Sequence, residues 1–112
     1  MKSIDLKVSK ENINGRDTFF TTYDLLKTAI NNPQEGFNVD EMVKRLRLLN
    51  KIDEHKQLFD IKPENFSDAD LEKKVTLELE DADFAKLKEL FATVKWAVVS
   101  QTIADIHTDL SK

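Results

Sequence analysis

KVTLELEDADFAKLKELF, residues 74–91, contains two periodicities, one directly after the other. In the first half apolar and polar side chains alternate, so that Val75, Leu77 and Leu79 share one face, which is typical of a half-buried strand. In the second half apolar residues recur at helical spacing: Phe84, Leu87, Leu90 and Phe91. Carboxylates between the two halves suit the positive end of a helix dipole. The stretch therefore predicts a strand followed by a helix from about Ala82.

A second alternating segment, Ser3 to Val8, lies at the other end of the chain. A lone strand would leave its backbone groups unpaired, so the two alternating segments are each other's most economical partners. We expect a two-stranded sheet, with a third short strand near Leu58 to Ile61 as an open alternative. The pattern does not fix the direction of pairing.

Asp17 to Asn31 follows a loop that turns at Gly15 and predicts a helix. Its apolar residues recur at intervals of four, three and four: Phe19, Tyr23, Leu26 and Ile30. The residues NNPQEG, 31–36, should end this helix, because Pro33 and Gly36 resist its continuation.

FNVDEMVKRLRLLNKIDEH, residues 37–55, contains a well-marked helix start. Asn38 can cap the first free amides, and Glu41 can complete a capping box. On a helical wheel the expected core face is Val39, Met42, Val43, Leu46 and Leu49. A basic stripe of Lys44, Arg47 and Lys51 lies almost opposite, with Arg45 and Leu48 at the margins.

Two further helices are indicated towards the C-terminus. Ser67 can cap a brief helix, and Ser100 can cap a final one that carries Ile103, Ile106 and Leu110. Because neither Gly nor Pro interrupts the segment, the final helix could also continue the preceding one, but we expect a kink or turn near Trp96 to Ser100. Together these elements predict a single α+β domain over residues 1–112, in which three to four helices pack on the small sheet.

The composition excludes several classes of function. The 112 residues contain 40% hydrophobic and 34% charged side chains, a globular balance, and the net charge of −4 opposes binding to phosphate backbones. The absence of cysteine excludes disulfides, thiolate metal sites and cysteine catalysis. No apolar run approaches the roughly 20 residues of a membrane span, and MKSIDLKV lacks a signal-peptide core, so we expect a cytoplasmic protein with no membrane partner.

The sequence marks no catalytic, cofactor-binding or metal-binding residue. His55 and His107 lack a recognisable nucleophile and oxyanion donors, so both are expected to face solvent. The acidic residues after the second strand lack the spacing of a calcium loop. With only Gly15 and Gly36 in the chain, no phosphate-binding loop of the known types can form. We therefore predict neither an enzyme nor a small-molecule substrate.

Two surfaces remain as candidates for binding. Phe20, Leu48 and Trp96 would carry binding energy to another protein, or to a second copy, if exposed, although each is also compatible with the core, as is Tyr23. The alternative is nucleic-acid binding through the helix at 39–53, with these residues: Lys44, Arg45, Arg47 and Lys51. An ordinary solvated helix face would explain the same cations.

Three segments, GFNVDEMVKRLRLLNKID (36–53), LELEDADFAKLKELF (77–91) and KWAVVSQTIADIHTDL (95–110), resemble small proteins of tailed-phage and prophage genomes. The resemblance covers about half of the chain. It implies a phage origin and an accessory, virion-assembly or host-regulatory role in the host cytoplasm or in the virion. That family has no settled activity, so no functional residue is carried over.

Overall fold

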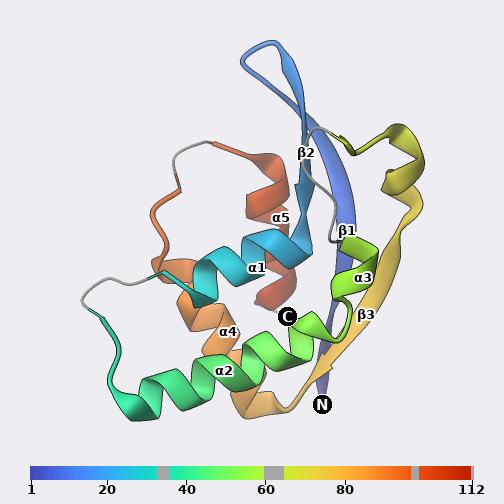
Figure 1. The fold of residues 1–112 in the computed structure, drawn as a ribbon. Coiled ribbons are helices and arrows are strands. Elements are labelled where there is room, and N and C mark those ends of the chain that lie inside the picture. The colour runs from blue at the N-terminus through green and yellow to red at the C-terminus, as the bar shows by residue number, and fades with distance from the viewer. Residues whose placement is uncertain (33–35, 60–64, 97–98, 112) are drawn as a thin grey trace.

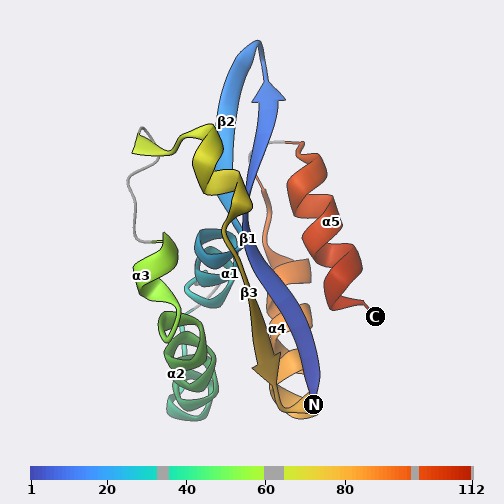
Figure 2. The same cartoon turned by 90° about the vertical axis from the view of Figure 1, so that its right-hand side faces the viewer.

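The computed structural model describes residues 1–32, 36–59, 65–96 and 99–111. Three antiparallel strands form one sheet in the order β2 (Arg16–Thr21), β1 (Lys2–Ile13) and β3 (Lys74–Leu79). Figure 1 shows α1, α2, α4 and α5 on one side of this sheet, and Figure 2 shows the sheet in front of α4. The predicted α+β class is confirmed.

The hairpin of β1 and β2 differs from the prediction. Asn14 and Gly15 connect the strands with φ values of 54° and 83°, the left-handed geometry of a two-residue hairpin turn. The residues from Asp17 to Thr21, expected to be helical, are therefore strand, and the helix is confined to α1 (Thr22–Ile30). A tight Asn-Gly turn and a run of β-favouring side chains outweigh the helical spacing there.

β3 pairs with the first half of β1, which confirms the predicted partnership of the two alternating segments. The pairing is antiparallel, from Lys2 opposite Leu79 to Lys7 opposite Lys74. The alternative third strand is wrong where it can be checked, because Leu58 and Phe59 belong to the short helix α3 (Lys56–Phe59). Residues 60 and 61 lie outside the described residues. The third strand is β2 instead.

Four helices begin at or next to the expected residues. They are α2 (Val39–Asp53), α4 (Asp81–Thr93), α5 (Gln101–Leu110) and the short 3₁₀ helix η2 (Asp68–Glu72). Glu80 before α4 makes no cap hydrogen bond, and the Glu41 carboxylate pairs with Arg45 and Lys86 instead of completing the predicted capping box. The Asn38 side chain accepts a hydrogen bond from the Glu41 amide at 2.8 Å, and Ser100 accepts one from Ile103 at 3.3 Å. With α3, the described residues contain five α-helices, slightly more than predicted.

Glu11 attaches the hairpin to the start of α5. Its carboxylate accepts hydrogen bonds from the Thr102 amide at 2.9 Å, the Thr102 hydroxyl at 2.8 Å, the Ser100 hydroxyl at 2.9 Å and the Gln101 amide at 3.1 Å. These donors, the Thr102 amide first, lower the pKa of Glu11. A charged side chain thus replaces water at the free amides of a helix start.

The core lies between the sheet and the helices. The following residues are at most 4% exposed: Ile4, Leu6 and Val8 of β1; Leu77 and Leu79 of β3; Leu26 and Ile30 of α1; Phe84, Leu87 and Phe91 of α4; Ile106 and Leu110 of α5. The core positions expected on β1, β3, α4 and α5 are thus confirmed, including Ile103, which is 8% exposed; the exception is the half-buried Val75. Within the described ranges, no helix is both long and apolar enough to span a bilayer.

Candidate protein-interaction surface

The outer side of α2 presents four apolar side chains that the structure leaves open. Val39 is 73% exposed, Met42 45%, Val43 52% and Leu46 55%. Their spacing of three, one and three residues places them in one stripe along the helix. We call these four residues the α2 apolar surface.

A shallow hollow of about 250 Å³ continues the α2 apolar surface towards α1. The guanidinium carbon of Arg45 lies 4.2 Å from the centre of the Phe37 ring, so this cation covers an aromatic face at the rim of the hollow. The remaining lining residues are Ile30, Asn31, Met42, Leu46 and Leu49. The α2 apolar surface and the hollow are thus continuous, and charged side chains border both.

The prediction of a core face on α2 is wrong for these four residues, and only Leu49 of that set packs against the core. The inward side of α2 instead carries Leu48 and Ile52, which are 1% and 0% exposed. Figure 1 shows why: the C-terminal part of α2 approaches the sheet, whereas its first turns lie far from it. Within the described residues, no apolar layer covers the outer side of its N-terminal half.

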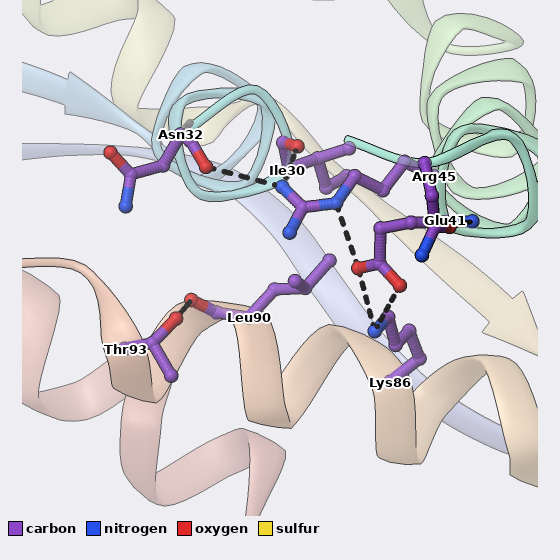
Figure 3. A network of polar contacts seen from close by, with 8 residues as sticks. Ile30, Asn32, Glu41, Arg45, Lys86, Leu90 and Thr93 are labelled. Atoms are coloured by element: carbon purple, nitrogen blue, oxygen red, sulfur yellow. Dashed lines mark hydrogen bonds and ion pairs between the residues drawn. The ribbon is translucent and has the colours of Figure 1, made fainter. Parts of the chain in front are cut away.

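A polar network fixes the N-terminal half of α2 to its neighbours (Figure 3). Arg45 donates to the carbonyl oxygens of Ile30 at 2.7 Å and Asn32 at 3.3 Å, which belong to the end of α1. Arg45 also donates to Glu41 at 3.0 Å, and the ammonium of Lys86 on α4 lies 2.7 Å from the same carboxylate. Contacts to Lys86 and then Arg45 lower the pKa of Glu41, so the carboxylate stays charged at neutral pH.

A second polar cluster fixes the other end of α2. The Tyr23 hydroxyl donates to the Asp53 carboxylate at 2.7 Å, and Lys27 donates to both groups at 3.1 Å. The hydrogen bond from Tyr23 lowers the pKa of Asp53, whereas burial and that same bond raise the pKa of Tyr23. The hydrogen bond with Tyr23 also raises the pKa of Lys27. Both ends of α2 are thus held in one rotation about the helix axis, which keeps the apolar surface outward.

The four cations proposed for nucleic acid do not form one free surface. Arg45 points inward into the network just described. Arg47 pairs with Asp83 at the start of α4. Lys44 and Lys51 are exposed on the side of α2 away from the hollow.

The three candidate partner residues are separated by the fold. Leu48 lies in the core, because the inward side of α2 includes this position, and it is not available to a partner. Phe20 is half-buried and packs against the core from β2. Trp96 is half-buried and packs on Phe91, with ring centres 5.2 Å apart, beside a second hollow of about 340 Å³ between α4 and α5. Tyr23 is 4% exposed and serves the cluster at Asp53.

The two histidines lie apart from the α2 apolar surface, although His107 lines the hollow beside Trp96. His55 is half-buried after α2, and His107 is exposed on α5. Among the described residues, no group of three or more histidine, aspartate or glutamate side chains is placed to hold a metal ion.

The sequence contains one signal for the α2 apolar surface. Leu48 and Ile52, one turn apart, form a second apolar side of the same helix. A helix needs only one apolar side to pack against the core. The second apolar side is therefore available for contact with a partner.

Comparison with protein-family models, curated proteins and solved structures found no match to this chain. The resemblance to phage proteins therefore has no support from relatives, and the function must be argued from the surface itself.

Proposed function

We propose that this protein is a non-catalytic protein-interaction module that binds its partner through the α2 apolar surface. One observation carries the proposal: four adjoining apolar side chains lie 45% to 73% exposed on a helix that polar clusters hold in a fixed rotation. Contiguous exposed apolar surface with a charged rim is characteristic of protein interfaces. Burial of these side chains by a partner would remove them from water.

The chemistry of the surface favours a protein over nucleic acid. Phosphate binding depends on free cations, and two of the four proposed for it already have partners inside the chain, Glu41 for Arg45 and Asp83 for Arg47. The net charge of −4 adds no attraction for phosphate. Nucleic-acid binding through Lys44 and Lys51 is the weaker proposal.

The biological setting is also a proposal and rests on the resemblance to phage proteins. In that setting the module would act as an accessory, virion-assembly or host-regulatory protein, in the host cytoplasm or in the virion. A rigid apolar surface on a small domain suits each of these roles, because each requires binding without chemistry.

A photo-cross-linking experiment tests the proposal. A photoreactive amino acid at Val43 should give defined protein adducts in the cells that produce this protein, and one at the exposed Lys88 of α4 provides the matched control. In lysates of those cells the yield of adducts should be the same when irradiation is done at about 50 and at about 200 mM salt, a range in which phosphate-dominated binding falls steeply. Equal labelling from both positions would refute a binding surface on α2.

A further inference from the structure

We infer that the occupant of the α2 apolar surface is a second copy of this chain, bound through antiparallel pairing of the two α2 helices. The inference rests on the proposed function and names its partner. It follows from the order of apolar and charged residues along α2, which is complementary to itself when the helix is reversed.

The apolar stripe is symmetric about a point between Met42 and Val43. A two-fold axis through that point places Val39 opposite Leu46 of the second copy, and Met42 opposite Val43. All eight exposed side chains of the two copies then cover one another. The first turns of α2 lie at the outer edge of the molecule, where a second copy can approach them (Figure 1).

The charges at the edge of the stripe select the antiparallel direction. Asp40 and Arg47 are seven residues apart, about two helical turns, so they lie on the same edge of the stripe. In the antiparallel pair this edge meets the same edge of the second copy, with Asp40 near the Arg47 of the other chain. Arg47 keeps 59% of its side chain exposed beside Asp83, and its guanidinium has donors for a second carboxylate.

Single cysteines test this geometry directly, because the chain contains none of its own. Val43→Cys lies next to the two-fold axis and should give a disulfide-linked dimer on mild oxidation. Val39→Cys alone should give no disulfide-linked dimer, because its two copies are displaced by seven residues, about 10 Å along the helix. A mixture of Val39→Cys and Leu46→Cys chains should form the mixed dimer.

Charge reversal provides an independent test. Asp40→Lys and Arg47→Glu each place like charges together in a pair of identical chains, so each should weaken self-association at least about tenfold. An equimolar mixture restores opposite charges at both contacts and should regain the wild-type association. Sedimentation should show the mass rising with concentration from 12.9 kDa towards twice that value for the wild type and for the mixture. Far-ultraviolet circular dichroism confirms that each variant is folded.

Three results would overturn the inference. The first is a wild type that stays monomeric at about 1 mM, where a dimer with a Kd of about 1 mM would already be detected. The second is a disulfide dimer of Val39→Cys alone, which indicates parallel pairing. The third is no recovery in the charge-reversal mixture. Photo-cross-linking at Val43 distinguishes a failure of the self-association inference from a failure of the proposed function. Adducts with a different protein leave the interaction module standing without self-pairing, whereas the absence of any adduct removes both.

Discussion

Replacement of Leu46 and of Leu48 by alanine, one at a time, tests the rotation of α2. The two leucines lie two residues apart on the same helix, yet Leu48 is 1% exposed and Leu46 is 55% exposed. The same chemical change should therefore have very different consequences for stability. The helical pattern of the sequence alone, with Leu46 on the expected core face and Leu48 at its margin, predicts the opposite order.

The expected size follows from burial. Leucine to alanine at a buried site costs about 2–5 kcal/mol, the transfer of the lost carbons plus the cavity left behind, so about 3 kcal/mol is expected for Leu48→Ala. Full burial of a leucine contributes about 1.5–3 kcal/mol, and Leu46 is less than half buried, so its loss should cost at most about 1 kcal/mol. Alanine recovers a small part of that cost through its higher helix propensity.

Urea unfolding followed by circular dichroism measures the difference. For a domain of this size the slope is about 1–3 kcal/mol per M, so a gap of about 2 kcal/mol separates the two midpoints by roughly 1 M. Leu48→Ala should also lower the melting temperature by about 10 °C. The measurements belong at low protein concentration, because a dimer would add the contact of Leu46 to the unfolding free energy.

Equal destabilisation by the two variants, or a larger effect of Leu46→Ala, would refute the reasoning. It would mean that the stripe of Leu46 faces the core and that no apolar surface is open for a partner. A dimer that persists at high dilution could also make Leu46→Ala destabilising. In that case the unfolding free energy would depend on protein concentration, whereas burial of Leu46 in the core would not produce such a dependence.

Three further predictions concern the rest of the fold. The pKa of Glu11 is lower in the folded state than its unfolded value of 4.5. Its stabilising contribution is therefore present above pH 4.5 and is lost as the pH falls through the folded-state pKa. Glu11→Gln should reduce the stability measured by urea unfolding at pH 7 but not at about pH 2. Tyr23→Phe should cost about 1–2 kcal/mol in urea unfolding through the lost hydrogen bond to Asp53, and absorbance titration of this single tyrosine should give a pKa above 10.0. Gly15→Ala should cost about 1 kcal/mol in thermal unfolding because of its φ of +83°, whereas Asn14→Gly should change stability by less than about 0.5 kcal/mol.

Elements whose signals are local were predictable from the sequence. α2 begins where Asn38 can cap it and runs over the expected residues, because capping is a contact between neighbours in the chain. The partnership of β1 and β3 was also predictable, since each alternating segment needed a second strand. The hairpin was missed because the phenylalanines of β2 also fit a helical period, and only the Asn14-Gly15 turn distinguishes the two.

The candidate surface could not be predicted because it depends on contacts between distant segments. The inward rotation of α2 is set by Arg45 reaching the end of α1, by Lys86 of α4 at Glu41, and by Tyr23 at Asp53, and no spacing in the sequence encodes these contacts. The charged pair Glu41 and Arg45 is drawn inward because carbonyl and ammonium partners compensate its desolvation.

The apolar pattern of α2 does not distinguish a face buried in the core from a face buried by a partner. A core face and an interface face are both apolar and both follow the period of the helix, since each exists to be removed from water. A pattern such as Val39, Met42, Val43 and Leu46 therefore indicates burial without saying by what. Here the described part of the chain does not bury it, and a polar network turns it outward. An apolar pattern of this kind indicates that the side chains are buried, and here a surface from another molecule can bury them. We therefore propose that a partner covers these four side chains.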